Sequence, residues 1–516
     1  MTEAVATPAP EAKTVHTTWA WWRTVHKIAG LAALVWLSVL GLTGWVLNHH
    51  EWRWSHQWTV PDWVTSARID RLVRGTIMRQ VMADPADPSR LLGGSERGLW
   101  FTTDGGKTWT DVTWEGADGL PQTYDFVAGP ANDLNHVWIG TDDGIWIVKD
   151  NGTRAVPFAL RGHDVTSLTP GSKPGELVGV DHHARIFRLD TAAPDAIAWT
   201  AVNDVRVEGL PDSLSLPSFT LDLHVGTGFL PQPWSLIVND YSGIAILILS
   251  ATGLVFWWLP RRWRHQHPKG QLKHRQKVLR WLYRGHGPII GILAIVPILY
   301  VSITGAMVDH IEALIEHGKE VRLPREALPS IYDYKNLTGE VSDVIAYPDA
   351  PEKFTIATRL GVYTSTDGGK TWMVERVLPE SDGTDASLVN LIRRDDLVFM
   401  GAGSIGQFVR RDGESAFAPL NVNGPKLAIT DAFKRGEAWH IKMSRSIYAA
   451  PDLTATFEDT KIPYPPITGT TFFLFLADIH TGNIFTSQWK WINNLVALLA
   501  VILTISGPIV WWKRKW

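Results

Sequence analysis

The sequence predicts a membrane α + β protein: four transmembrane helices, arranged as an internal duplication, with a β-propeller-like periplasmic domain built from two halves. Three observations support this class. Four apolar segments are long enough to cross a hydrocarbon layer of about 30 Å. Landmark residues recur at an offset close to half of the 516 residues. Two long segments between the apolar ones alternate apolar and polar residues between Gly and Asp turns, which is typical of strands.

The elements follow in order along the chain. We expect a cytoplasmic N-terminus (1–27), a first span (28–48), a first periplasmic β segment (49–235), a second span (236–259), a basic cytoplasmic loop (260–287), a third span (288–308), a second periplasmic β segment (309–490), a fourth span (491–512) and a cytoplasmic tail (513–516). The first span lacks a small-residue cleavage site, so we expect it to be retained.

Basic residues set the expected orientation. Residues 259–285 hold nine Lys or Arg and no acidic residue, and the tail contains Lys513, Arg514 and Lys515. The positive-inside rule then places both termini in the cytoplasm of a bacterial inner-membrane protein. The basic residues lie beside the apolar segments, so we expect no nucleic-acid partner and a lipid bilayer as the surroundings.

The two outer segments carry matching β repeats. The run 98–109 (GLWFTTDGGKTW) returns as 361–372 (GVYTSTDGGKTW). Both resemble the Asp-box, a hairpin turn of β-propellers in which Asp caps the turn and the glycines supply positive φ. Related units are centred on Trp100, Trp146, Phe187, Tyr363, Phe408 and Ile447. Steps of about 40–45 residues suit propeller blades, so we expect one six-bladed propeller. Two separate three-unit domains are the alternative. No arginine cluster or acid pair indicates a glycosidase.

Three pairs of histidines keep their place in both halves, out of eighteen histidines in the chain. They are His26 and His286 (286 − 26 = 260), His49 and His310 (310 − 49 = 261), and His224 and His480 (480 − 224 = 256). The spans also repeat small-residue pairs: Thr43-Gly44, Thr252-Gly253, Thr304-Gly305 and Ser506-Gly507. In an antiparallel bundle, Gly253 and Gly507 fall level with His26 and His286. We expect each glycine to leave room for a flat macrocycle.

The histidines indicate haem. Ionisable residues near spans are costly and usually functional, and neutral imidazole is a common axial ligand of haem iron. The chain has no Cys, which excludes covalent c-type attachment and thiolate-held iron–sulfur clusters. We therefore expect two b-type haem groups, with ligands drawn from the six paired histidines. Any one interfacial histidine alone would be read as a snorkelling side chain. Seven Met and no Cys make copper a weaker choice. His182-His183 is kept as a substrate-side metal contact.

A family resemblance supports this interpretation. The runs VHKIAGLAALVWLSVLGLTGWVLNHH and LHVGTGFLPQPWSLIVNDYSGIAILILSATGLVFWWLPRR resemble the PepSY-associated transmembrane family. The resemblance implies an inner-membrane reductase that carries b haem and takes iron from ferric siderophores. By residue match, His26 and His224 correspond to the family's recurrent histidines, and His286 and His480 are their duplicates. No PepSY sequence is found in the outer segments, so substrate identity does not follow.

The expected function is electron transfer from a quinol or a cytoplasmic reductant to a periplasmic acceptor, a ferric siderophore or other chelate, bound between the propeller and the outer histidines. His26 and His49 are 49 − 26 = 23 residues apart, about 35 Å on a helix. Either a quinone or an aromatic such as Trp36 or Trp45 bridges this gap, the ligands lie deeper, or both haem groups lie outside. The alternative function is a non-enzymatic sensor or scaffold.

Overall fold

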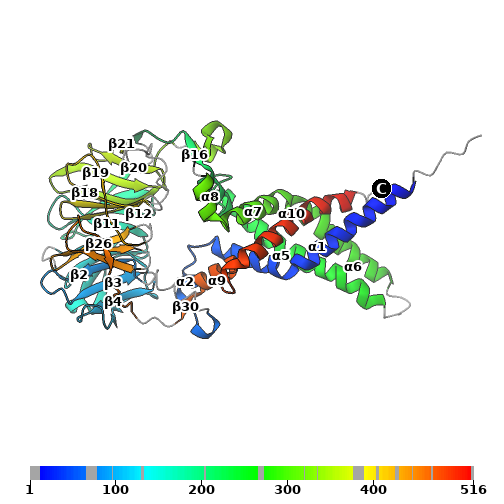
Figure 1. Ribbon diagram of the computed structural model, residues 1–516, viewed down its shortest axis with the longest axis horizontal. Helices are drawn as coiled ribbons and strands as arrows, with labels where there is room; N and C mark the ends of the chain where they lie inside the picture. The colour runs from blue at the N-terminus through cyan, green and yellow to red at the C-terminus, as the bar shows by residue number, and fades with distance from the viewer. Residues whose placement is uncertain are drawn as a thin grey trace, which may run out of the picture. The chain divides into compact units, whose positions relative to one another are not determined.

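A computed structural model gives the fold (Figure 1). It describes residues 12–65, 78–95, 97–129, 133–202, 205–264, 272–318, 320–333, 335–375, 389–402, 406–424, 429–443, 446–465 and 469–512. The expected tail 513–516 and part of the expected basic loop (265–271) lie outside these residues. The chain forms two compact units. A helical unit holds Met1–Arg53, Ser213–Tyr332 and Phe473–Trp516, and a β unit holds Trp54–Asp212 and Asp333–Phe472.

The helical unit is a bundle in which α1 packs against both α5 and α10, and α7 packs against α10 and α5. Its helices are α1 (Ala12–Leu47), α4 (Leu216–His224), α5 (Trp234–Arg264), α6 (Leu272–Arg284), α7 (Ile295–Val308), α8 (Ile311–Gly318), α9 (Phe472–Thr481) and α10 (Lys490–Trp512). The short strands β16 (Ser213–Ser215) and β17 (Arg322–Pro324) pair antiparallel. Small residues let α1 and α5 approach closely: a Cβ on Gly243 would lie 2.8 Å from the Gly41 carbonyl oxygen.

Three helical segments are long and apolar enough to cross a membrane: Ala20–Leu47, Trp234–Trp263 and Ser487–Trp512. They contain all of the second and fourth expected spans and all but the last residue of the first. The expected third span is not one straight helix. Lys273–Gly291 and Ile295–Val308 meet at a bend of 63°, and counting this pair as one span gives up to four. The bend follows a π-helical segment, Gly285–Gly291, that contains Pro288. Proline removes a backbone donor, and proline and π-helical turns are common causes of kinks.

Among the described residues, the β unit has six antiparallel sheets of four strands, two of which gain a short parallel fifth strand. It also has one antiparallel pair of short strands, β1 (Thr59–Val60) and β30 (Thr470–Thr471). The first segment supplies β2 (Gln80–Ala83), β3 (Leu91–Ser95), β4 (Gly98–Thr102), β5 (Thr110–Asp111); β7 (Thr123–Ala128), β8 (Val137–Thr141), β9 (Gly144–Lys149), β10 (Arg154–Ala159); and β11 (Val165–Pro170), β12 (Glu176–Asp181), β13 (Arg185–Asp190), β14 (Ile197–Ala201).

The second segment supplies the other three sheets. They are β18 (Val341–Tyr347), β19 (Ala350–Thr358), β20 (Gly361–Ser365), β21 (Thr371–Glu375); β22 (Val389–Arg394), β23 (Leu397–Ala402), β24 (Gly406–Arg411), β25 (Ala418–Pro419); and β26 (Ile429–Arg435), β27 (Ala438–Met443), β28 (Ser446–Ala450), β29 (Glu458–Asp459). The added strands are β6 (Thr113–Trp114) on β10 and β15 (Arg206–Glu208) on β21. Since β15 comes from the first segment and β21 from the second, this pairing joins the two.

The sheets form a closed ring of blades, as in a β-propeller (Figure 1). Their first strands touch in the order β2, β7, β11, β18, β22, β26 and back to β2. Side chains on these strands link neighbouring blades. Asp125 accepts the N–H of Leu168, and Ser167 accepts the N–H of Val344. Around the same ring, Asp343 accepts from Leu391 N–H and Asp431 from Val81 N–H. The six blade centres expected from the sequence all fall on the third strand of a different blade.

The two DGGKTW turns have the same hydrogen bonds. One Asp104 carboxylate oxygen accepts the N–H groups of Lys107 and Thr108, both at 2.9 Å, and the other accepts the Thr108 hydroxyl. Asp367 makes the equivalent three bonds in the second copy. The glycines after each Asp have positive φ. The carboxylate therefore caps a hairpin turn, a structural role with no free acid for catalysis.

Candidate functional site

Two of the three expected histidine pairs are brought together in the helical unit. The rings of His26 (α1) and His286 (the π-helical segment before α7) have centroids 6.4 Å apart. The rings of His224, the last residue of α4, and His480, near the end of α9, have centroids 6.2 Å apart. Each pair takes one histidine from each sequence repeat.

A hydroxyl group contacts the Nδ1 atom of each of these four histidines. Thr43 lies 2.8 Å from His480 Nδ1, and Thr252 lies 2.8 Å from His286 Nδ1. The other two contacts are Ser506 to His26 at 2.8 Å and Thr304 to His224 at 3.3 Å. All four hydroxyls belong to the small-residue pairs found in the sequence. The small size of these residues does not by itself predict their hydrogen bonds to the histidines.

These contacts determine the tautomer. The hydroxyls of Thr43, Thr252 and Thr304 donate to the main-chain carbonyls four residues earlier, at 2.7, 2.6 and 2.8 Å. Because that hydrogen is used, the remaining bond must run from the ring Nδ1–H to the hydroxyl oxygen. The other ring nitrogen, Nε2, then keeps its lone pair. A neutral imidazole with Nδ1–H donated and Nε2 open is the form that ligates a metal.

The four glycines lie against the histidine rings. A Cβ added to Gly305 would lie 3.0 Å from Cε1 of His224, and one on Gly44 would lie 3.2 Å from Cε1 of His480. The corresponding distances are 3.6 Å from Gly253 to His286 and 3.5 Å from Gly507 to His26. The levels match the sequence expectation. Each glycine leaves room for the imidazole ring beside it, and the room expected for a flat macrocycle stays a prediction.

Two buried asparagines hold the main chain at His224 and His480, the pair called outer below. The sequence interpretation missed both asparagines. Asn239 donates to the main-chain carbonyl of His224 at 2.8 Å, and its amide oxygen accepts from Tyr300. Asn493 contacts the carbonyl of His480 at 3.3 Å and accepts from Trp36 Nε1 at 2.6 Å. Their offset, 493 − 239 = 254, equals that of Gly253 and Gly507. The repeat offset that selected the histidines could therefore also have selected these two asparagines.

The third expected pair is placed differently. His49 lies between Asp240, 3.0 Å from Nε2, and Glu51, 2.7 Å from Nδ1, and stacks on Trp52. His310 Nε2 contacts the Asn494 amide at 2.8 Å. Both ring nitrogens of His49 thus have partners within the chain. The structure does not bring His49 and His310 together.

The geometry of the two close pairs fits one metal between two imidazoles. A metal–imidazole nitrogen bond is about 2.0–2.1 Å, and the ring centroid lies roughly 1.1 Å beyond that nitrogen. Two imidazoles on opposite sides of one metal therefore have centroids about 6.3 Å apart, which both pairs match. Among the described residues, no group of three or more His, Cys, Asp or Glu is arranged to hold a metal ion. A ligand set of two histidines leaves the equatorial positions to a macrocycle, as in b-type haem.

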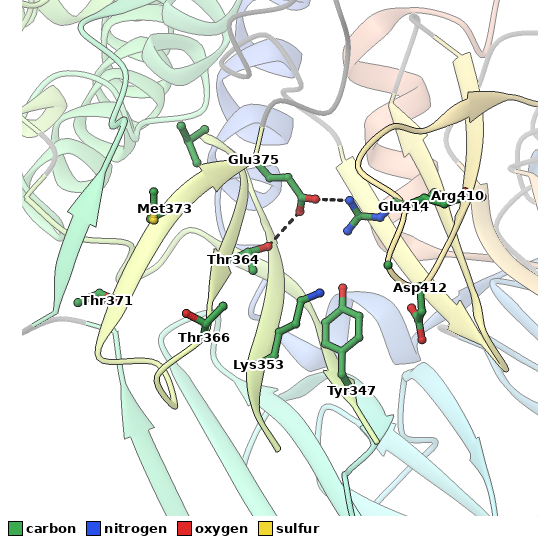
Figure 2. Close-up of a pocket in the computed structure, with 12 residues that line it drawn as sticks. Tyr347, Lys353, Thr364, Thr366, Thr371, Met373, Glu375, Arg410, Asp412 and Glu414 are labelled. Atoms are coloured by element: carbon green, nitrogen blue, oxygen red, sulfur yellow. Dashed lines mark hydrogen bonds and ion pairs between the residues drawn. The ribbon is translucent and has the colours of Figure 1, made fainter. Parts of the chain in front are cut away.

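The β unit has a polar pocket between its fourth and fifth blades (Figure 2). Glu375 accepts from Thr364 at 3.0 Å and pairs with Arg410. The ammonium group of Lys353 lies 4.1 Å from the centre of the Tyr347 ring. None of the expected histidines lines this pocket. The carboxylate of Glu375 and the guanidinium of Arg410 on its wall thus form an ion pair with each other.

The reserved pair His182-His183 lies in the turn between β12 and β13, where both residues have positive φ. His183 Nδ1 donates to the Val341 carbonyl at 2.7 Å, a bond between the third and fourth blades. His182 lies near the carboxylates of Asp164 and Asp181, at 3.9 and 3.7 Å. These contacts describe a structural turn at the junction of the two segments.

The chain shows distant likeness to several solved structures. An ancestral GH74 enzyme is 9% identical over 73% of this chain and 36% of its own, with a TM-score of 0.34. The C-terminal WD40 domain of Sif2 is 9% identical over 74% of this chain and 86% of its own (TM-score 0.32). The GH74 xyloglucanase from Xanthomonas campestris is 10% identical over 76% and 65% (TM-score 0.23). The matched part of this chain is thus about a third of the first of these proteins.

No curated protein sequence matches the chain. A family model does: the one described as PepSY-associated TM region matches residues 69–514, which is most of the sequence. That match, together with three apolar helices of membrane-spanning length, makes this a membrane protein. The chain belongs to the PepSY-associated TM family.

Proposed function

We propose that this chain is a b-type haem protein of the bacterial inner membrane that transfers electrons to a periplasmic acceptor. The observation that carries the proposal is the set of four histidines whose Nδ1 atoms contact hydroxyls. His26 and His286 would ligate one haem, and His224 and His480 the other. Haem supplies one-electron redox chemistry when it is bound. The rival function, a sensor or scaffold, leaves these paired rings and their shared hydrogen-bonding pattern without a purpose.

The chain's own residues fix the ligands. Thr43, Thr252, Thr304 and Ser506 orient the rings and hold the proton on Nδ1. Such partners of a ligating histidine raise its basicity and fix its orientation. Asn239 and Asn493 tie the ends of α4 and α9 to the spans α5 and α10. In this proposal His49 and His310 are not ligands, because both ring nitrogens of His49 and Nε2 of His310 contact other side chains.

The two histidine layers are closer than the sequence suggested. On α1 the outer layer is level with Thr43, and 43 − 26 = 17 residues separate it from His26. At about 1.5 Å per residue this is about 26 Å along the helix, against 35 Å for His26 to His49. Trp36 lies between the layers, hydrogen-bonded to Asn493 and packed on Trp489. This arrangement favours one haem near each end of the bundle over two outside.

The proposed acceptor is ferric iron in a siderophore or another chelate, each ferric ion taking one electron to become ferrous. The donor would be a quinol or a cytoplasmic reductant. The basic residues near the His26 end favour a cytoplasmic location for that end, so electrons would leave at His224 and His480. Resemblance to inner-membrane siderophore reductases supports this acceptor class.

The cofactor is tested on the detergent-purified chain. We expect non-covalent haem that acid–acetone extracts completely, a sharp low-spin α-band on reduction, and two haem groups per chain. His286→Ala should remove one of the two, and His286→Ala with His480→Ala should remove both. His310→Gln is the matched control and should keep both. Full haem content in the double variant, or a colourless wild-type protein, would refute the ligand assignment.

The acceptor is tested separately on protein reduced under anaerobic conditions. Adding ferric siderophores should reoxidise the chain while a colorimetric chelator traps ferrous iron in equal amount. A chain that stays reduced with every ferric chelate but is reoxidised by a quinone would keep the haem assignment and remove iron as the acceptor.

A further inference from the structure

Helix α6 carries a row of positive charge on its exposed side. Lys273, Lys277, Arg280 and Arg284 are all exposed, and they stand at positions i, i + 4, i + 7 and i + 11 of one helix. This spacing puts them on one face, over about 16 Å at 1.5 Å per residue. We call these four residues the α6 basic row. The opposite side, with Leu282 buried and Tyr283 edge-on to Phe256, packs against the bundle.

Among the described residues, the helices around this row contain few acidic residues. From Tyr241 to Val308, a stretch that includes most of α5 and all of α6 and α7, the sequence contains no Asp or Glu. Neither does the sequence of α1 or α10. Among the described residues, no carboxylate forms an ion pair with any of the four side chains. The row is therefore free to attract anions from outside the chain.

Aromatic residues beside the row indicate what kind of anion. Trp281 is 73% exposed and follows Arg280 directly. At the end of α5, Arg261 and Arg262 lie over Trp257 and Trp258, at 4.5 and 4.9 Å from the ring centres. Tryptophan concentrates at the headgroup level of membranes, and basic residues beside it face lipid phosphates.

The course of the chain agrees. α6 leads through the π-helical segment into α7, and the two halves of this pair meet at 63°. If α7 crosses the bilayer along its normal, α6 is tilted by 63° from that normal. It then lies closer to the plane of the membrane surface, as interfacial helices do. α6 also ends two residues before His286, so an anion bound there lies beside one of the paired histidines.

We propose that the α6 basic row is a binding site for the headgroups of anionic phospholipids. The row would take several phosphate groups at once, with Trp281 inserted among the acyl chains next to them. The ligand class is a lipid and not free phosphate, because the indole adds an apolar contact that only an amphiphile can use. This inference does not depend on haem binding.

The test uses the full-length chain in nanodiscs of phosphatidylcholine that contain spin-labelled phosphatidylglycerol or spin-labelled phosphatidylcholine. The immobilised fraction of each label gives the selectivity. We expect the wild type to prefer phosphatidylglycerol at low salt and to lose part of that preference at high salt. The variant Lys273→Gln/Lys277→Gln/Arg280→Gln/Arg284→Gln should reduce the preference at least about tenfold, since each basic residue contributes about 1 kcal/mol near an anionic surface.

A control variant carries the same change of net charge elsewhere. Lys107→Gln/Lys149→Gln/Lys173→Gln/Lys370→Gln alters four exposed lysines of the β unit and should keep the wild-type selectivity. Trp281→Ala should weaken binding of both labels and leave the ratio between them. Equal immobilisation of the two lipids by the wild type, or unchanged selectivity in the α6 variant, would overturn the proposal. Competition by free phosphate at millimolar concentration would also overturn it in favour of a simple anion site.

Discussion

Four hydroxyl side chains decide which nitrogen of each paired histidine is available. In Thr43 the hydroxyl hydrogen goes to the Val39 carbonyl at 2.7 Å, so the oxygen can only accept from His480 Nδ1. A hydroxyl within a span thus does two things: it satisfies its own hydrogen inside the helix, and it sets the proton position on a ring in another helix. Valine has the same shape but can do neither.

Thr43→Val should therefore weaken the outer site selectively. In this variant the Nδ1–H of the His480 ring would stay buried without an acceptor. A buried donor left unsatisfied costs about 1–3 kcal/mol. Loss of such a partner typically lowers metal affinity about 10–100-fold. Haem content and midpoint potentials, measured by titration, should change for one of two haem groups. Thr43→Ser should restore both values; if Val and Ser behave alike, the hydroxyl does not act on the ring.

Gly305 and Gly507 lie at different distances from the histidine rings beside them, so the effects of alanine at the two positions can be compared. Alanine at Gly305 would put its Cβ 3.0 Å from the His224 ring, closer than most such contacts, whereas at Gly507 the distance to the His26 ring is an ordinary 3.5 Å. Gly305→Ala should shift or broaden the low-spin signal of the outer site in electron paramagnetic resonance. Gly507→Ala should leave the inner signal unchanged. Equal effects would mean that the ring position is not set by this contact.

At this scale the sequence predicts some residues and not others. The repeat offset selects all three histidine pairs, His49 and His310 included, because a repeated histidine is rare enough to be noticed. The structure brings two of the three pairs together. The offset does not predict that His49 would bond to Asp240, since that contact depends on how the end of α1 meets α5. Asn239 was missed because an amide near the start of a span looks like an ordinary interfacial residue.

At the scale of the elements, the first strands of the blades carry three buried carboxylates. Burial raises the pKa of Asp343 to about 7, and the charge of Asp125 adds to the effect. Burial also raises the pKa of Asp125 to about 6. Both still accept a main-chain N–H from the next blade. A raised carboxyl pKa means that the folded state binds the proton more tightly than the unfolded chain does.

The raised pKa of Asp343 sets the direction in which the stability of the β unit should change with pH. Between about pH 4 and pH 7 the folded state holds more protons on Asp343, so its contribution to the unfolding free energy falls as pH rises. Asp343→Asn should become more stable relative to wild type over that range, by on the order of a few kcal/mol. Urea unfolding of the full chain, followed by near-ultraviolet circular dichroism, measures this difference.

Asp104→Asn serves as the control for that measurement. Hydrogen bonds from Thr108 hold the pKa of the Asp104 carboxyl below its ordinary value, so it stays charged throughout this range. The variant should lose stability by a similar amount at every pH. A pH slope for Asp343→Asn equal to that of wild type would show that Asp343 does not titrate as the buried geometry implies.

Blade spacing and turn chemistry were sufficient to predict the β elements. Trp100 and Tyr363 were expected at blade centres, and both lie on third strands in the cores of their blades. The third span was predicted less well. Apolar composition marks residues 288–308 as membrane-crossing. It does not reveal that Pro288 lies in a π-helical segment, which depends on hydrogen bonds along the helix and on packing with α5 and α10.

The two halves of the sequence complete each other. Each close histidine pair combines one residue from before position 265 with one from after position 271. Each outer segment supplies three blades of the ring. The two halves are therefore not independent domains joined by a linker.

Dividing the chain within residues 265–271 tests this. Either half produced alone should be colourless, because it lacks one histidine of each pair. Produced together, the halves should associate and bind both haem groups. Haem in one half alone, at normal stoichiometry and with a low-spin spectrum, would contradict the shared sites. Co-purification of the halves through an affinity tag on one of them measures the association.

The closed ring of blades also affects when its contacts can form during synthesis of the chain. The last strand of the third blade ends at Ala201 and the first strand of the fourth begins at Val341, so 341 − 201 = 140 residues separate them in synthesis. At roughly 5–20 residues per second, a nascent chain waits about 7–28 s between these points. During that interval the Val81 N–H and the Ser167 hydroxyl lack the partners that Asp431 and Val344 later provide. A nascent half-ring has open strand edges and is prone to aggregation, so the yield of this protein in the cell should depend on how fast its second half is made.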